Sequence, residues 1–69
     1  MKGVGPLVVT EFGSSLRVRG RGAGDFLRGY CGFSPMFVAG AFVIDRSRGA
    51  DLAAMCDYQH IKYRWETAA

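Results

Sequence analysis

Basic residues recur along this chain with a spacing that could bind anionic groups. Arginines occupy alternate positions from 17 to 21, and a lysine and an arginine alternate at 62 and 64. Side chains two residues apart on a β-strand point to the same face, so each set would share one side of a sheet. Cations that neutralise phosphates release counterions, which favours nucleic-acid binding. The predicted contacts for nucleic acid or an acidic partner are Arg17, Arg19, Arg21, Arg46, Arg48, Lys62 and Arg64.

The same spacing also has a purely structural interpretation. Outward-facing strand positions are polar in any soluble sheet, and arginine and lysine serve there. The net charge of +3 is small for a nucleic-acid-binding protein. Tyr63 and Trp65 alternate with the basic residues of their segment, so we expect them on the opposite face, where they cannot form a base-stacking platform with the cations. A solvated basic face and a nucleic-acid contact are both open alternatives.

Two other segments resemble binding motifs but lack essential parts. Residues 20–25 form a glycine-rich connection ahead of a predicted helix, a place where backbone N–H groups can bind anions. The connection has neither the Lys-Ser/Thr pair of a P-loop nor a dinucleotide fingerprint, and Asp25 would repel phosphate. Cys31, Cys56 and His60 supply three soft ligands where structural zinc needs four. We therefore predict no metal and no cofactor.

Catalytic chemistry is poorly supported by the residues. The chain has one histidine, with no serine or threonine near it in the sequence, and its acidic residues are scattered. A chain of 69 residues also has little room for a ligand pocket of typical volume. We predict no catalytic residues and no enzyme. The two cysteines are interpreted as small buried side chains in a reducing compartment.

The most apolar part of the chain is a predicted hairpin. Residues 36–38 and 41–44 flank the tight turn Ala39-Gly40 and are apolar on both faces. Such strands are either covered on both sides or exposed to a partner. Because 49% of the residues are hydrophobic, more than one small core can cover, we predict a homo-oligomer, such as a homodimer, or an obligate partner. The candidate apolar interface is Met36, Phe37, Val38 and Phe42.

The strands and helices that must position these residues can be predicted from the spacing of apolar residues and from the residues typical of turns. We expect strands over residues 7–12, 16–19, 36–38, 41–44 and 60–66, and short helices over residues 25–32 and about 49–57. The order is β-β-α-β-β-α-β in a single domain over residues 1–69. An antiparallel or mixed sheet with both helices on one face would bury every apolar stripe, so the predicted fold class is α+β.

An internal repeat supports this organisation. Residues 19–23 read Arg-Gly-Arg-Gly-Ala, and residues 46–50 read Arg-Ser-Arg-Gly-Ala. Each stretch is followed by an aspartate, an apolar stretch, a cysteine and an aromatic residue, with Cys31 and Cys56 in equivalent places. We therefore predict a duplicated β-β-α unit with a final strand appended.

The longest apolar run, residues 36–44, is far short of the roughly 20 residues that a membrane-spanning helix needs. The N-terminal residues have no long apolar core typical of a signal peptide. We therefore expect no membrane partner and a cytoplasmic location.

Residues 42–54 resemble small β-hairpin-plus-helix modules found beside helicases and in short actinobacterial phage proteins. In these modules an aromatic-aliphatic strand end leads into an Ala-Asp-Leu-Ala helix, which residues 50–53 match. The high arginine, glycine and alanine content is similar to that of proteins from high-G+C bacteria and their phages. The resemblance implies a phage- or mobile-element-type regulator or inhibitor that docks on a host protein or nucleoprotein complex.

These observations lead to one prediction of function and one alternative. The first is a small non-enzymatic binding protein whose affinity comes from the apolar hairpin and whose association is steered by the basic residues of the 17–19 and 62–64 segments. The alternative is a module that binds nucleic acid directly through the basic sheet face.

Overall fold

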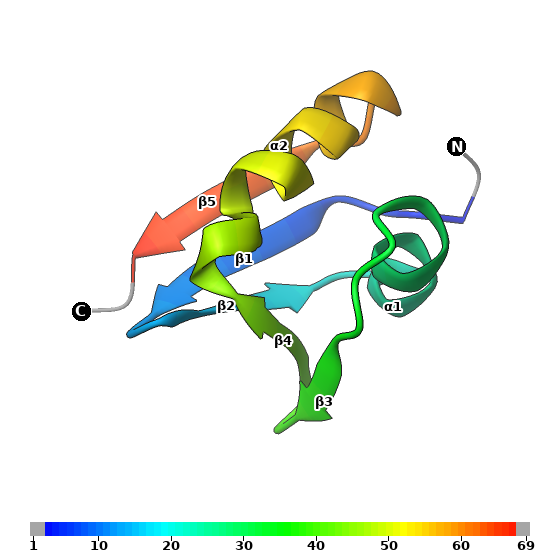
Figure 1. Cartoon of the computed structure of the whole chain (residues 1–69). Helices are drawn as coiled ribbons and strands as arrows, with labels where there is room; N and C mark the ends of the chain where they lie inside the picture. The colour runs from blue at the N-terminus through cyan, green and yellow to red at the C-terminus, as the bar shows by residue number, and fades with distance from the viewer. Residues whose placement is uncertain (1–2, 68–69) are drawn as a thin grey trace.

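The computed structural model describes residues 3–67 as one five-stranded mixed sheet with two short helical segments on one face (Figure 1). The strand order is β3-β4-β2-β1-β5. The elements are β1 (Leu7–Phe12), β2 (Ser15–Arg19), α1 (Ala23–Asp25), η1 (Phe26–Tyr30), β3 (Met36–Val38), β4 (Ala41–Asp45), η2 (Arg46–Arg48), α2 (Gly49–Tyr58) and β5 (Tyr63–Thr67).

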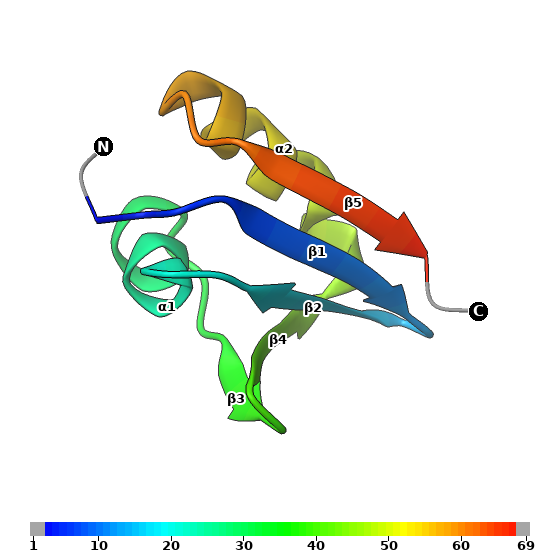
Figure 2. The ribbon, with the colours of Figure 1, turned by 180° about the vertical axis from the view of Figure 1, so that it is seen from behind.

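The sheet is antiparallel except at one edge. β1 pairs with β2, β2 with β4, and β4 with β3, all antiparallel, whereas β5 pairs with β1 in parallel. β4, β1 and β5 run in the same direction. The chain therefore returns from the end of β4 to the start of β5 through the crossover helix α2, and β5 pairs in parallel with β1. Figures 1 and 2 show α2 lying along one side of the sheet. The predicted α+β class and the β-β-α-β-β-α-β order are confirmed.

The two helical segments differ more than the repeat suggests. The first is one α-helical turn followed by a π-helical turn, in which the N–H of Cys31 donates to the C=O of Phe26 at 3.1 Å. The second is a regular helix of ten residues, preceded by the 3-10 turn η2. Ala53 and Ala54 favour helix in α2, whereas η1 contains Gly29, which disfavours helix.

The last strand begins later than the alternation of residues 60–66 indicates. His60 adopts a left-handed conformation with φ of 57°, and the N–H of Ile61 donates to the C=O of Cys56 at 2.8 Å. These residues therefore complete the end of α2, and extended pairing with β1 starts at Tyr63.

The hydrophobic core lies between the sheet and the helices. Alternate residues of β1, β2 and β4 meet η1 and α2 there, and Trp65 covers Gly49 at the start of α2. The largest fully buried side chains are Leu7, Val9, Leu16, Val18, Phe26, Leu27, Leu52 and Cys56. This arrangement uses one face of the sheet and leaves the other without a helix.

The glycine-rich connection after β2 has a structural function. Gly20 has φ of 140°, and a Cβ there would lie 2.6 Å from the carbonyl oxygen of Pro6 and 2.8 Å from Cδ2 of Leu7. Gly22 has φ of 78°, and a Cβ there would lie 2.5 Å from the carbonyl oxygen of Gly3. The chain after β2 can therefore pass beside the segment before β1 only because these positions have no side chain.

We expect Gly20→Ala to lower the free energy of unfolding by about 1–3 kcal/mol, since it adds both a steric overlap and backbone strain. Gly29→Ala is the matched control, because a Cβ at Gly29 meets nothing within 4 Å; we expect a change within about 1 kcal/mol, in the stabilising direction. Urea denaturation followed by circular dichroism measures both. Equal stability of the two variants would contradict this role of Gly20.

Candidate functional site

The sheet face opposite the helices is called the open face here, and Figure 2 views the molecule from this side. The strand register aligns one residue from each strand across this face. The order from β3 to β5 is Met36, Val43, Arg17, Thr10 and Glu66. The row begins with apolar side chains on the hairpin and becomes polar and charged from β2 onwards.

Neighbouring residues extend the same gradient. Arg19, Val8 and Arg64 align across β2, β1 and β5, and Val38 pairs with Ala41 at the β3 end. A hollow of about 210 Å³ lined by Thr10, Phe12, Arg17, Arg19, Ala39 and Ala41 joins the basic and apolar parts. The basic strand and the apolar hairpin, which are separate in the sequence, therefore lie on one continuous surface.

The arginines of β2 lie along the open face. The guanidinium carbon of Arg17 is 4.0 Å from the centroid of the Phe12 ring, which is a cation–π contact. Nη2 of Arg19 donates to Oγ1 of Thr10 at 3.4 Å. Phe12 was not assigned to this face from the sequence, although its alternation with Val8 and Thr10 along β1 is the signal that could have found it.

The basic residues of the last segment extend this surface to the other edge. Arg64 lies next to Val8 on the open face, as the alternation predicts, while Tyr63 and Trp65 align with the helix-facing Leu7 and Val9. Arg64 forms an ion pair with Glu66 at 3.0 Å, which lowers the net positive charge at this edge. Lys62 is exposed immediately before β5.

Arg46 does not belong to the predicted basic surface. Its Nη2 contacts Oε1 of Glu11 at 2.7 Å, and its Nη1 donates to the carbonyl oxygen of Gly13 at 3.2 Å. Oε2 of the same Glu11 accepts a hydrogen bond from Nε1 of Trp65 at 2.6 Å. Arg19 ends a strand, whereas Arg46 begins a 3-10 turn beyond the strand. The side chains at these two equivalent positions of the repeat therefore point in different directions.

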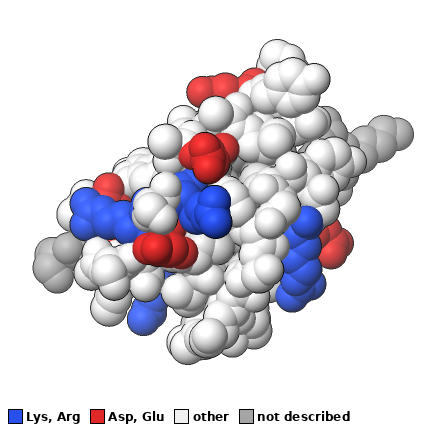
Figure 3. Space-filling model, viewed as in Figure 1, with Lys and Arg blue, Asp and Glu red and all other residues white. Residues whose placement is uncertain are grey.

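Arg48 also lies away from the open-face arginines, and Arg21 lies outside the strands. Arg48 is on the helix side, with its guanidinium carbon 5.7 Å from the Phe33 ring centroid. Arg21 lies in the glycine-rich connection, where its carbonyl oxygen accepts the N–H of Gly5 at 2.9 Å. On the helix-covered face, basic and acidic side chains are interspersed (Figure 3). Of the seven predicted contact residues, Arg46 and Arg48 therefore do not share the sheet face of Arg17 and Arg19, which corrects their assignment to one binding surface.

Three of the four predicted apolar interface residues are exposed. Met36, Phe37 and Val38 have exposed fractions of 67%, 61% and 43%. Phe42 is the exception, because its ring lies over Gly24 of α1, where an added Cβ would be only 2.6 Å from Cζ. Phe42 therefore joins β4 to α1 and is not a free docking residue, which corrects the sequence-based assignment.

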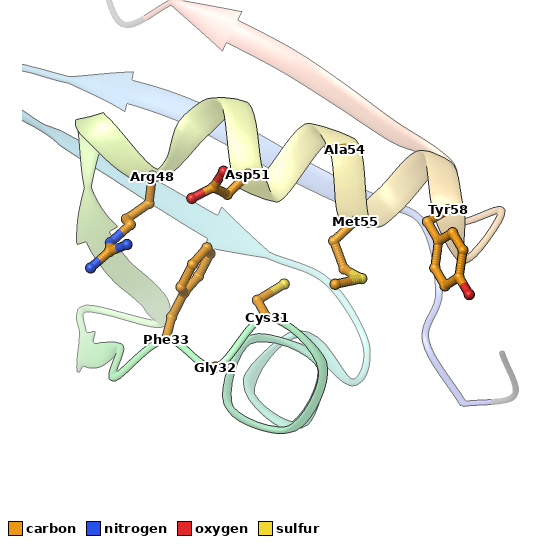
Figure 4. A pocket seen from close by; sticks show the side chains of 8 residues that line it. All are labelled: Cys31, Gly32, Phe33, Arg48, Asp51, Ala54, Met55 and Tyr58. Atoms are coloured by element: carbon orange, nitrogen blue, oxygen red, sulfur yellow. The ribbon is translucent and has the colours of Figure 1, made fainter.

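A groove of about 540 Å³ lies on the helix side, between α2 and residues 31–33 (Figure 4). Phe33, Met55 and Cys31 form its apolar part, and Arg48 and Asp51 lie together at one end. Within residues 3–67, no group of three or more histidine, cysteine or acidic side chains could hold a metal ion. The groove is separated from the open face by the sheet itself.

The two cysteines are free thiols. Cys56 is fully buried, as predicted, whereas Cys31 is half-buried beside the groove. Burial raises the pKa of Cys31 to about 11, helped by the Asp51 carboxylate. Burial likewise raises the pKa of Cys56 to about 11, with smaller effects from Cys31 and Asp57. Both thiols are therefore protonated at neutral pH, which makes them poor nucleophiles.

Comparisons with protein-family models, curated proteins and solved structures found no match. None of the helices in residues 3–67 combines the length and apolar character needed to cross a membrane. The assignment of the candidate site therefore rests on the geometry of this chain alone.

The raised thiol pKa values predict a pH dependence of stability. An unfolded cysteine ionises near its ordinary pKa of 9.0, below the folded value of about 11, so the unfolded state loses protons first. The cysteine contribution is complete below pH 9 and is lost as the pH rises towards 11. We expect the double variant Cys31→Ser/Cys56→Ala to be less stable at pH 7 but to lose less further stability between pH 8 and 11. If the denaturation midpoints of both proteins fell equally between pH 8 and 11, this prediction would be contradicted.

Proposed function

We propose that this chain is a small non-enzymatic binding protein that docks on another protein through its open face. One observation carries the proposal: exposed apolar side chains of β3 lie in register with the arginines of β2 on a sheet face without helices. In this arrangement Met36 and Val38 supply apolar contact area, and Arg17 and Arg19 select an acidic partner.

The energetics favour this division of roles. Burying a side chain such as Met36 or Val38 contributes roughly 1.5–3 kcal/mol relative to leaving it exposed. The arginines contribute more to association rate and specificity than to affinity, because exposed ion pairs are weak. β2 is two strands from β3, so the complementary partner surface has an apolar patch with carboxylates about 10 Å away.

Direct nucleic-acid binding is the second candidate, and the shared face of Arg17, Arg19 and Arg64 is the observation that favours it. Phe12 adds one aromatic ring to that face. A phosphate backbone would, however, leave the apolar hairpin uncovered, and Arg64 already contacts Glu66. Docking on a protein accounts for both parts of the surface, and the regulator or inhibitor role implied by residues 42–54 is part of the same proposal.

The proposal is tested by quantitative pull-down from host lysate treated with nuclease, using two open-face variants. We expect Met36→Ser/Val38→Ser and Arg17→Glu/Arg19→Glu each to reduce capture of the same protein at least tenfold. Tyr58→Ser and Arg48→Glu are the matched controls, because both side chains are exposed on the helix side; they should leave capture unchanged.

Capture that is equally insensitive to all four variants would contradict docking through the open face. A gel shift with mixed-sequence single-stranded DNA and RNA at two salt concentrations tests the second candidate. Strongly salt-sensitive binding that Arg17→Glu/Arg19→Glu abolishes, with no protein captured after nuclease treatment, would favour nucleic acid instead.

A further inference from the structure

Phe37 is exposed in a place that open-face docking does not explain. Its cross-strand partner is Phe42, which faces the helices, and the two ring centroids are 4.9 Å apart. Phe37 therefore points to the side of the sheet opposite Met36 and Val38, yet 61% of it is exposed. Only an occupant that reaches both faces of β3 at once can cover all three side chains, and a strand added at the edge does this.

The free edge of β3 offers backbone groups for such a strand. Ala39 and Gly40 form a two-residue turn with φ of 51° and 80°, the conformation of a tight hairpin. In such a hairpin Val38 and Ala41 exchange hydrogen bonds, and hydrogen-bonded pairs then alternate along the strands. The N–H and C=O of Phe37 consequently point away from β4, towards the open edge of the sheet.

The two edges of the sheet differ in how they are protected. Charged residues commonly protect an edge strand against pairing with another chain. β5 carries Arg64 and Glu66, whereas β3 consists of Met36, Phe37 and Val38 alone. An uncharged, apolar edge of this kind is suited to pairing.

We propose that two copies of this chain associate through their β3 edges, antiparallel and around a two-fold axis at Phe37. The N–H of Phe37 in each copy donates to the C=O of Phe37 in the other. The two sheets then form one continuous sheet, and the Phe37 and Phe42 rings of both copies meet on the helix side, where aromatic pairs add to the burial of apolar area.

Charge favours a second copy as the occupant. β3 is neutral, so the paired strands themselves bring no like charges together at the two-fold axis. On the helix side, the guanidinium carbon of Arg28 lies 5.8 Å from the centroid of the Phe42 ring, where it can also contact aromatic rings of the second copy. The two β2 strands would be separated by five strand spacings, about 24 Å, which exceeds the screening length of about 8 Å at physiological ionic strength. The β2 arginines of the two copies therefore do not oppose the pairing.

The association is weak because the paired segment is short. β3 has three residues, and Pro35 before it has no N–H to extend the ladder. A pairing of three residues is too short for a large buried interface, so we expect a weak dimer with a dissociation constant in the micromolar range or higher. Dimerisation would place the open-face Met36 and Val38 of both copies side by side, with arginines at each end. The dimer does not depend on the proposed function, because it forms between two copies of this chain and needs no other partner.

Sedimentation equilibrium of the full chain over a range of concentrations tests the dimer. We expect reversible dimerisation, with Phe37→Lys lowering the association constant at least tenfold because two lysines would meet at the axis. Tyr58→Lys is the matched control at an exposed aromatic residue on α2 and should leave it unchanged. Circular dichroism confirms that each variant retains the fold.

Amide hydrogen exchange measured by NMR on the unmodified protein gives a second test. Exchange of the Phe37 amide should slow as the protein concentration rises, and the amide of Glu66 on the opposite edge strand should not respond. A monomer at all concentrations up to about 1 mM, a dimer that Phe37→Lys does not weaken, or a concentration-independent Phe37 amide would each overturn the inference.

Discussion

The structure depends on the tight packing of two short helical segments against a single face of the sheet. The helical segments of residues 3–67 cover one face only, and the core formed there contains the largest fully buried side chains of these residues. The other face is therefore left to solvent or to a partner. The side chains on that face, apolar at β3 and basic at β2, make it the candidate binding surface.

A polar contact holds the corner where α2 begins. Glu11 accepts hydrogen bonds from Trp65 and Arg46, which joins β1, β5 and η2 at one point. This contact uses one of the basic residues that a sequence pattern assigns to binding. Its position illustrates why charge alone does not identify a binding residue: the same guanidinium group serves either structure or recognition, and the partner it contacts decides which.

Local patterns predicted much of the fold, and the candidate site only in part. Alternation in residues 16–19 correctly placed Arg17 and Arg19 opposite Leu16 and Val18, because a strand has a period of two. The Phe42 ring is covered because α1 approaches β4 closely at Gly24. Local sequence patterns do not predict this long-range contact. Arg46 was assigned to the wrong side because the sequence repeat matches it to Arg19. Arg19 is still part of a strand, whereas Arg46 follows the end of one, where the direction of the side chains changes.

The central claim is that the arginines of β2 and the apolar side chains of β3 share one sheet face while the helices cover the other. Nuclear Overhauser effects from the Val43 methyl groups test it most directly, since Val43 lies between Met36 and Arg17. The account predicts contacts from Val43 to these two side chains and none to Leu52 of α2. Strong effects between Val43 and Leu52, with none to Arg17, would contradict it.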